Sequence, residues 1–361
     1  MVTITTIPTT QTAIWVDQPG ESALITLRDD VPVPTPKEND ILVKIECSGL
    51  CHSDVYNMMG HHPMDVHIPG HEGVGVIVQM GSRASQVGNL RLGQRVGIKW
   101  IHETCGQCPA CQRNNTVCPR QHNSGRDRDG TLQQYLTVPA SHATPIPDGI
   151  SSEVAAPLLC EHADDMVAGL TMYSAVGKCR TQNGDWIVIQ GGGGGLGHLG
   201  VQIAVQKGLK VIAIDGEDKR NFCMGLGASA FFSFADPDLE QKIKSLAEDF
   251  GAHAVVCSPG SEAAYNQGIK LLRPGGTLVC VGLPSNGSYT MPLRPIDMVN
   301  RGLHVIGSAV GTEAEMQELL KLASTGAIVP QIEVMPLSQY AEAIEAVKTS
   351  KASGKIVLKM P

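Results

Sequence analysis

The chain has 361 residues, enough for two domains, and 42% of its residues are apolar while 17% are charged. These values are ordinary for a globular protein and exclude a disulfide-stapled miniprotein, a disordered acidic chain and a coiled coil. Lys and Arg number 28 against 35 Asp and Glu, a net charge of −7 that repels a phosphate backbone, so we expect no nucleic-acid partner. We find neither a signal peptide nor the roughly 18 uninterrupted apolar residues of a membrane span, and we expect a cytoplasmic protein with no membrane partner.

The first third of the chain reads as short β-strands separated by Pro and Gly, at residues 41–46, 73–78 and 95–100. Strands at this spacing predict a barrel-like β domain. From Trp186 onward, apolar strands alternate with amphipathic helices, which is typical of βαβ units in a parallel sheet. The expected strands are 186–189, 210–215, 230–234, 252–257, 277–281 and 303–307, with helices such as 196–207 and 239–249 between them.

The last fifty residues leave this alternation. We expect a helix at 313–324, a strand, a second helix at 339–349 and a closing strand at 355–359, all returning to the first domain. The segment Arg273-Pro-Gly-Gly before the fifth strand predicts a helix stop and a tight turn. The parallel-sheet domain is therefore expected to be inserted between two parts of the β domain.

A glycine-rich turn follows the first strand of the parallel sheet and contains Gly192, Gly194 and Gly197 in the pattern G-x-G-x-x-G. Glycines allow the backbone to approach a pyrophosphate, whose charge is met by free amides and the positive end of the helix dipole. Asp215 ends the next strand, 215 − 197 = 18 residues later, where a carboxylate accepts hydrogen bonds from the adenosine ribose and repels a 2′-phosphate. This context favours an NAD site over a merely flexible loop or a surface Asp.

The residues of this turn that we expect to bind the cofactor are Gly192, Gly194, Gly195, Leu196 and Gly197, together with Asp215. Lys219 or Arg220 is placed to reach the same ribose. Arg220 also keeps NADP open as the alternative cofactor.

Thiols and imidazoles in the first third indicate metal. Cys51 follows a strand and His71 opens another, and both are ligands that suit zinc, which leaves a fourth position for substrate when it has three protein ligands. Either residue alone is as well explained by a buried thiol or a satisfied core histidine. The cysteines Cys105, Cys108, Cys111 and Cys118 crowd together as in a closed structural zinc site; a zinc ribbon that binds nucleic acid is the alternative, but it would need basic surroundings.

With these motifs in place, the chain resembles the zinc-dependent medium-chain dehydrogenase/reductase family, in particular its tetrameric microbial alcohol dehydrogenases. The resembling segments are Val31–Pro34, Ile41–Asp54, Gly70–Ile77, Gly97–Trp100, Asp129–Thr131, Ala155–Cys160, Gly194–Leu199, Val211–Gly216 and Val281–Pro284. The resemblance implies a GroES-like β-barrel catalytic domain at 1–164 and 309–361, with a structural zinc lobe at 100–120. It also implies a Rossmann dinucleotide-binding domain, a doubly wound parallel sheet, at 165–308. A homo-oligomer, either a tetramer or a dimer, is expected.

The resemblance implies two zinc ions per chain. The catalytic zinc would be bound by Cys51, His71 and Cys160, with Glu72 close behind the metal, and Asp54 would orient His71. Ser53 would relay the alcohol proton, with a capping serine as the alternative. The structural zinc would take the four lobe cysteines, although the six residues between Cys111 and Cys118 are one fewer than the family usually has.

Further roles carried over from the family concern cofactor and substrate. His52 would lie near the cofactor pyrophosphate, Thr171 would touch the nicotinamide, and Val281 and Leu283 would also contact the cofactor. Met58 and Trp100 would line the substrate pocket, although core packing explains a methionine equally well. Relatives end the proton relay at a histidine where this chain has Tyr56, a poor base near pH 7.

Two departures from the family stand out. Seven residues, 161–167, intervene between Cys160 and the Ala-Gly-x-Thr run, and we expect this insert to loop out, with Asp164 or Asp165 capping a helix that begins near Met166. Glu161 and His162 are possible substitute ligands, although a solvated loop explains them better. Glu313 stands where close relatives have an arginine, and its charge should weaken cofactor binding unless the carboxylate points away.

The leading hypothesis is a zinc-dependent oxidoreductase that transfers a hydride between a primary or secondary alcohol, or the matching aldehyde, and NAD(H). An NADPH-linked reductase of a bulkier carbonyl is the second possibility. A cofactor-binding relative without catalysis is the third, because of the insert and Glu313.

Overall fold

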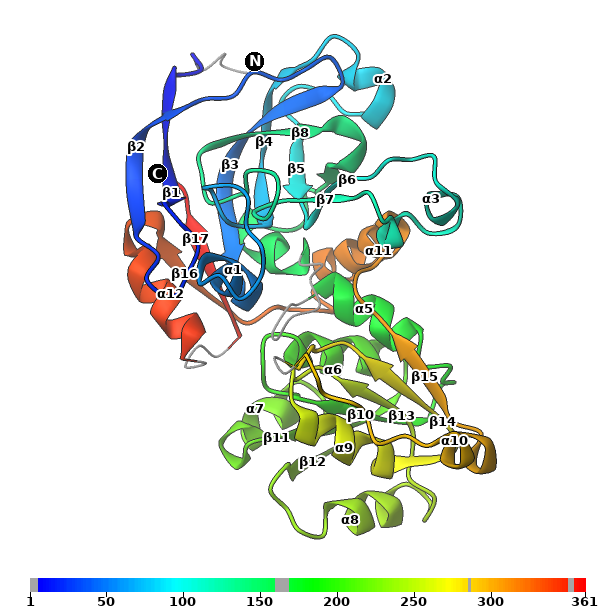
Figure 1. Ribbon diagram of the computed structural model, residues 1–361. Helices are drawn as coiled ribbons and strands as arrows, with labels where there is room; N and C mark the ends of the chain where they lie inside the picture. Colours follow the sequence, from blue (N-terminus) through cyan, green and yellow to red (C-terminus); the bar gives the residue numbers. More distant parts are fainter. Residues whose placement is uncertain (1–5, 160–168, 285–286, 350–353) are drawn as a thin grey trace. The chain divides into compact units, whose positions relative to one another are not determined.

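The computed structural model describes residues 6–159, 169–284, 287–349 and 354–361 (Figure 1). The described chain forms two units. Unit 1 comprises Met1–Glu161, Thr312–Thr325 and Ile332–Pro361, and unit 2 comprises His162–Gly311 and Gly326–Gln331. Unit 2 is thus inserted between segments of unit 1, and the short segment Gly326–Gln331 near the C-terminal end also groups with unit 2. No helix within the described ranges is long and apolar enough to span a membrane.

Unit 1 is built on a curved, mainly antiparallel sheet. Its strand order is β16 (Ile332–Pro336), β17 (Lys355–Lys359), β3 (Asp40–Leu50), β4 (Glu72–Met80), β5 (Arg95–Ile98) and β9 (Thr144–Pro145), and β8 (Tyr135–Pro139) also pairs with β3. Two smaller hairpins are β1 (Thr10–Val16) with β2 (Ile25–Pro32), and β6 (Ile101–Glu103) with β7 (His122–Asn123). The expected barrel-like β domain is confirmed by this sheet, and the closing strand 355–359 has the predicted bounds.

The alternating side chains of these strands fill one hydrophobic core. Ile14, Val43, Ile77, Leu132 and Leu358 come from five different strands or loops and are almost fully buried. Around the core lie the helices α1 (His52–Met58), α2 (Ala84–Gly88), α3 (Pro109–Arg113), α4 (Ser152–Ala155), α11 (Glu313–Ser324) and α12 (Tyr340–Lys348). The long strands β3 and β4 carry the residues discussed below at their ends.

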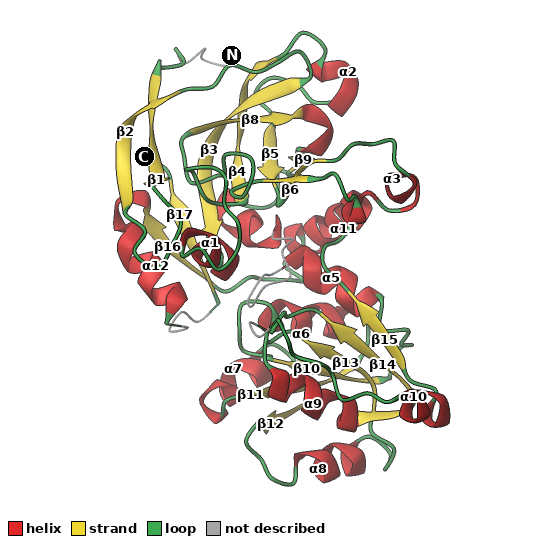
Figure 2. Ribbon diagram, in the orientation of Figure 1, coloured by secondary structure: helices red, strands yellow, loops and turns green. Residues whose placement is uncertain are grey.

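Unit 2 contains a six-stranded, wholly parallel sheet with helices on both sides (Figure 2). The strand order is β12 (Ala230–Ser233), β11 (Lys210–Asp215), β10 (Trp186–Gln190), β13 (Ala252–Cys257), β14 (Leu272–Cys280) and β15 (His304–Gly307). The helices are α5 (Gly169–Gly177), α6 (Gly197–Gln206), α7 (Arg220–Gly225), α8 (Leu239–Leu246), α9 (Glu262–Leu271) and α10 (Pro295–Arg301). Counted along the chain, the strands lie in the order 3-2-1-4-5-6, so the predicted doubly wound dinucleotide-binding sheet is confirmed.

The fifth strand of unit 2 differs in detail from the prediction. Helix α9 stops at Leu271 as expected, but β14 starts at Leu272 instead of Thr277. Pairing with β13 jumps from the Ala252–Leu272 pair to the next regular pair at Thr277, so the Pro-Gly-Gly residues form an irregularity inside the strand. The predicted tight turn therefore takes the form of a bulge inside the strand. Its Gly275 has a φ of +76°, which a glycine adopts without strain.

Candidate active site and zinc lobe

Cys51 occupies the junction where β3 ends and α1 begins. It is the N-cap of α1, and its backbone N–H donates to Asp54 Oδ2 at 3.0 Å. The Ser53 hydroxyl donates to Cys51 Sγ at 3.0 Å. Both contacts are buried, so the strand end and the first helical turn together hold the thiol in one place.

His71 lies beside Asp54 although 17 residues separate them along the chain. The ring Nδ1 is 2.7 Å from Asp54 Oδ1, and both side chains are fully buried. A carboxylate at Nδ1 fixes the tautomer with its proton there, which leaves the Nε2 lone pair available to a metal. Burial acts to lower the pKa of His71, but the charges and hydrogen bonds of Asp54 and Cys51 together raise it well above its usual value.

Glu72 is the third member of this group, and its carboxylate is held by a cation that sequence reasoning missed. Lys355 on β17 places Nζ 2.7 Å from Glu72 Oε1, and both side chains are almost completely buried. Gly49 on β3 lies directly opposite Glu72, and a Cβ there would come within 2.0 Å of Glu72 Oε2. The glycine therefore provides the space that the carboxylate occupies. The sequence around Lys355 gave little sign of this role, because lysines stand at both ends of the strand and only its interior, residues 356–358, is apolar.

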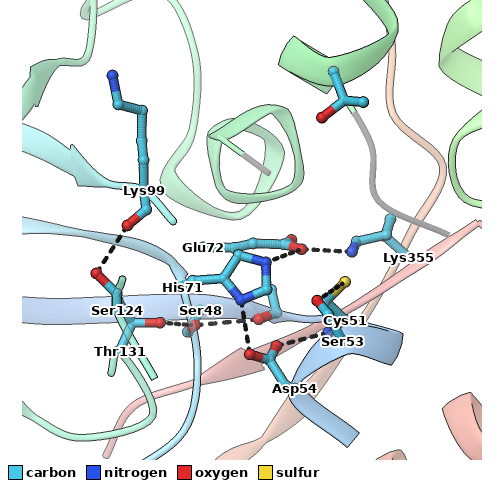
Figure 3. A network of polar contacts seen from close by, with 12 residues as sticks. Ser48, Cys51, Ser53, Asp54, His71, Glu72, Lys99, Ser124, Thr131 and Lys355 are labelled. Atoms are coloured by element: carbon cyan, nitrogen blue, oxygen red, sulfur yellow. Dashed lines mark hydrogen bonds and ion pairs between the residues drawn. The ribbon is translucent and has the colours of Figure 1, made fainter. Parts of the chain in front are cut away.

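Cys51, His71 and Glu72 each offer a ligand atom, and these atoms all lie within 4.8 Å of one another (Figure 3). Figure 3 shows the His71 ring between the carboxylates of Asp54 and Glu72, with Lys355 on the side of the Glu72 carboxylate away from His71. A buried thiol, an imidazole with its Nδ1 engaged and a carboxylate are a donor set that suits zinc. Cys160, the further ligand that the resemblance implies, lies outside the described residues, as does the 161–167 insert.

Trp100 and Met58 were both expected at the substrate pocket. In the structure the two residues have different surroundings. The Trp100 ring meets the His71 ring nearly edge-on, with 5.3 Å between centroids, and its side chain is 5% exposed. Met58 is fully buried in the hydrophobic core of unit 1, which favours the packing role. Trp100 is thus the aromatic wall beside the candidate metal ligands.

Cys105, Cys108, Cys111 and Cys118 gather in a lobe between β6 and β7. Their sulfur atoms are 3.5 to 4.0 Å apart in four pairs. A tetrahedral zinc with Zn–S distances of about 2.3 Å separates its sulfurs by about 3.8 Å. The four thiols therefore have the spacing of a closed tetrahedral site, with no position left for a substrate.

Local turns bring these cysteines together despite the short Cys111–Cys118 interval. Cys108 caps α3, where its sulfur accepts from the Cys111 backbone N–H at 3.4 Å, and Pro109 follows at the first helical position. Asn114 then caps a single 3-10 turn that leads to Cys118. The Gln107 backbone amide favours the thiolate and helps to lower the pKa of Cys105 to about 6.

The glycine-rich turn of unit 2 approaches its neighbours as a phosphate-binding turn requires. A Cβ on Gly197 would lie 1.9 Å from the Gly191 carbonyl oxygen, and one on Gly192 would lie 2.9 Å from the Ala213 side chain. Asp215 accepts from the backbone N–H groups of Gly193 and Gly216, each at 2.7 Å. These hydrogen bonds tie the end of the second strand to the glycine-rich turn.

A cavity of about 360 Å³ opens beside this turn within unit 2. It is lined by Gly194, Gly195, Leu196, Asp215 and Phe234, and on its other wall by Ser258 and neighbouring residues of the loop before α9. A cavity at the carboxyl ends of strands β10 and β13, where the strand order reverses, is the usual place of a dinucleotide in such a sheet.

The cations near Asp215 are differently engaged. Arg220 forms a two-pronged pair with Glu217, with N–O distances of 2.5 and 3.0 Å, and stacks over the Phe231 ring. Lys219 packs closely against Gly193. A Cβ added to that glycine would lie 2.8 Å from the Lys219 side chain. The Arg220 guanidinium is therefore already paired with Glu217, three residues before it, whereas Lys219 lies against the glycine-rich turn.

The remaining residues expected at the cofactor are placed as follows. Thr171 is fully buried in α5, and its hydroxyl donates to the Ala309 carbonyl at 3.2 Å. Val281, directly after β14, is buried, while Leu283 is 52% exposed. His52, in unit 1, is 7% exposed, and burial, with a smaller effect of Lys355, lowers its pKa. His52 is therefore mostly neutral at pH 7.

Comparison with known proteins places the chain among known enzymes. Residues 37–148 match the family described as "Alcohol dehydrogenase GroES-like domain", and residues 195–325 match "Zinc-binding dehydrogenase". The chain is 38% identical to "Alcohol dehydrogenase 2" of Emericella nidulans, with 98% of both chains covered. It is 36% identical to "Alcohol dehydrogenase" of Schizosaccharomyces pombe, with 91% of this chain and 92% of that protein covered.

Solved structures agree in fold. The acetophenone reductase of Geotrichum candidum in complex with NAD superposes with a TM-score of 0.81 at 26% identity, over 98% of both chains. A putative zinc-binding dehydrogenase of Sinorhizobium meliloti bound to NADP gives a TM-score of 0.84 at 26% identity, over 98% of this chain and 100% of that one. The relatives, the family matches and the two-unit fold agree, and the chain belongs to the zinc-dependent medium-chain alcohol dehydrogenase family.

Proposed function

We propose that the protein transfers a hydride between a primary or secondary alcohol, or the matching aldehyde or ketone, and NAD(H), with one catalytic zinc and one structural zinc per chain. The observation that carries the proposal is the buried group of Cys51, His71 and Glu72, in which Asp54 engages His71 Nδ1 at 2.7 Å. That hydrogen bond orients the imidazole as a metal ligand, and the thiol and the carboxylate beside it distinguish the group from a single satisfied core histidine. Cys160 is proposed to complete the ligand set.

The residues of unit 1 near the proposed substrate position have different roles. Zinc held by these ligands supplies Lewis-acid polarisation of the substrate oxygen. The Ser53 hydroxyl, 3.0 Å from Cys51 Sγ, is placed to exchange the alcohol proton. Lys355 balances the Glu72 carboxylate, and the Trp100 ring beside His71 limits the space for the substrate. Tyr56 lies close to the rings of His52, His61 and His62 and, with its high intrinsic pKa, is not the terminal base.

NAD is the proposed cofactor. The Asp215 carboxylate lines the unit 2 cavity, where it would accept from the ribose hydroxyls and repel a 2′-phosphate. Arg220, the residue that could favour NADP, is paired with Glu217. An NADPH-linked reductase is the second candidate, because a structure with 26% identity to this chain is described as bound to NADP. A cofactor-binding relative without catalysis is the third candidate.

A homo-oligomer in the cytoplasm is also proposed. Strand β15 is an edge of the parallel sheet, and its Val305 is 36% exposed. Ile296 and Val299 on the preceding helix α10 are 58% and 79% exposed. An open strand edge beside apolar side chains favours pairing with a second copy. The described cysteines are all free thiols, as in reducing compartments.

One experiment separates these functions. Zinc content is measured together with turnover of a panel of alcohols and aldehydes with NAD(H) and NADP(H). Two zinc ions per chain and a clear preference for NAD(H) are expected. A preference for NADPH with bulky carbonyls would support the second candidate. Cofactor binding without turnover of any pair would overturn the proposal in favour of the third.

A further inference from the structure

Glu313 is the first residue of α11 and lies two residues after Gly311, where the chain passes from the long segment of unit 2 into unit 1. The helix does not need this carboxylate as a cap. Thr312 and Glu315 form a reciprocal capping box, with the Thr312 backbone N–H donating to Glu315 Oε2 at 2.7 Å. The role of Glu313 must therefore be sought in its other contacts.

Three donors converge on the Glu313 carboxylate, two from outside its helix and one, Gln317, from the next turn of α11. Lys99 Nζ and the Thr144 hydroxyl both reach Oε2, at 2.5 and 2.7 Å, and Gln317 Nε2 reaches Oε1 at 2.9 Å. The Lys99 side chain is only 8% exposed. A buried ammonium needs a charged partner, whereas the Glu313 side chain is 48% exposed, so Lys99 is the member that depends on the pair. The contacts fasten the start of α11 to the end of β5 and to β9.

Lys99 immediately precedes Trp100, the aromatic wall beside His71. Ser124 fixes the backbone of both residues: its hydroxyl donates to the Lys99 carbonyl and its backbone N–H to the Trp100 carbonyl, each at 2.9 Å. Figure 3 shows the Lys99 side chain extending away from His71 while its backbone contacts Ser124. The two-residue segment is thus held at its backbone by Ser124 and at its side chain by Glu313.

We propose that Glu313 is a positioning residue that sets substrate selectivity: by holding Lys99 it fixes the place of the Trp100 ring against His71. The proposal rests on the proposed function insofar as Trp100 borders the substrate. It also gives a reason for a carboxylate at a position where, by the resemblance to the family, close relatives have an arginine. An arginine at this position would bring a second cation against the buried Lys99, whereas Glu313 neutralises it.

The competing account is that Glu313 acts through its charge on the bound cofactor. The two accounts predict different outcomes for Glu313→Gln. If the residue positions Trp100, the ring gains freedom and binding of the alcohol weakens, while cofactor affinity hardly changes. If it repels the cofactor, removal of the charge tightens cofactor binding and leaves Trp100 as it was.

The experiment follows Trp100 directly, in the zinc-loaded protein with Trp15→Phe and Trp186→Phe, because the chain has three tryptophans. In Glu313→Gln we expect red-shifted emission, greater quenching by acrylamide and an about tenfold higher KM for the alcohol with little change in kcat, the pattern of lost uniform binding. The rise in KM should be smaller for bulky alcohols than for small ones. The dissociation constant of NAD should change less than about twofold. Glu315→Gln, which weakens the helix cap alone, is the matched control.

A reciprocal variant guards against a general loss of structure. Lys99→Gln should shift the Trp100 emission in the same way, and the double variant should add little, because both substitutions break one contact. Emission and quenching equal to those of Glu315→Gln would overturn the proposal, and so would an unchanged Trp100 with NAD bound at least tenfold more tightly. Since fluorescence needs no turnover, a shift of Trp100 in a protein that oxidises no alcohol would refute the proposed function and leave the positioning role intact.

Discussion

The two cysteine-containing groups of unit 1 are built in opposite ways. The lobe draws its four sulfurs from fourteen consecutive positions, Cys105 to Cys118, and holds them by short local turns. The buried group takes Cys51, His71 and Glu72 from the ends of two strands and stabilises each through another residue. In the lobe the sulfurs contact mainly one another, whereas in the buried group Asp54, Ser53 and Lys355 contact the ligands.

This difference indicates what each group requires. A lobe of short turns buries little apolar surface, so a bound metal would supply most of its order. The buried group has its hydrogen bonds in place and lies on the long strands β3 and β4, so the protein itself holds it ready. Loss of metal should therefore unfold the lobe and leave the geometry of the buried group largely intact. The following predictions test this contrast, from the largest expected effect to the smallest.

Substitution of Cys51 by Ser should abolish catalysis without unfolding unit 1. We expect turnover to fall at least about 10³-fold, because the catalytic metal and its stabilisation of the reacting oxygen are lost. Zinc should fall from two ions to one per chain by elemental analysis, with a near-normal thermal midpoint. A protein that kept two zinc ions and its activity would remove Cys51 from the site, and a protein that unfolded would break the contrast with the lobe.

Substitution of Lys355 by Met should leave the Glu72 carboxylate buried without its cation. Breaking a buried pair in this way costs about 3–5 kcal/mol of unfolding free energy. Urea unfolding of the zinc-free protein measures the loss, with Lys355→Arg as the charge-preserving control. The double variant Lys355→Met with Glu72→Gln should recover most of the stability. A loss below about 1 kcal/mol in Lys355→Met would show that Glu72 does not depend on this pair.

Substitution of Cys111 by Ser should disrupt the lobe alone. The lobe zinc should be lost, and cleavage by a protease within residues 105–118 should rise at least about tenfold, because local order there depends on the metal. The catalytic zinc and the Trp100 emission should remain. If the catalytic zinc were lost as well, the two groups would be coupled, and the contrast drawn above would not hold.

The smallest expected effect concerns pH. His102 on β6, which leads into the lobe, is 8% exposed, and burial together with nearby Arg128 lowers its pKa from 6.5 to about 3. Below pH 6.5 the unfolded chain takes up a proton that the folded protein does not, so stability should fall by roughly 1 kcal/mol per pH unit between pH 6.5 and 5. His102→Gln should flatten this slope in urea unfolding between pH 7 and 5. Substitution of the exposed His61 by Gln should not.

Much of the fold could be predicted because its signals are local. The apolar strands of the parallel sheet and the helix 313–324 follow from periodicity and turn residues, and the order of glycines before Asp215 indicates the dinucleotide turn. The structure of the Arg273-Pro-Gly-Gly segment was harder to predict, because a turn sequence can also form a bulge within a strand. Periodicity cannot distinguish the two, since the choice depends on pairing with β13.

Much less of the site's supporting structure could be predicted, because it depends on contacts between distant segments. The pair of Lys355 and Glu72 joins residues 283 positions apart, and that of Lys99 and Glu313 joins residues 214 apart. Spacing carries no information at such separations. The sequence showed only that Glu313 carries an unexpected charge. That its partner is Lys99 emerges from the fold, in which α11 returns to β5 and β9.

Gly49 has a consequence for how this protein can change. Because the Glu72 carboxylate fills the space that any side chain at position 49 would need, the strand cannot accept even alanine there without displacing the carboxylate from Lys355. In a scan of all substitutions, position 49 should therefore be as intolerant as the metal ligands, although it has no functional group of its own. A side chain at position 49 could therefore be accepted only after Glu72 had been replaced by a smaller residue. Sequence variation near the metal ligands must arise at other positions.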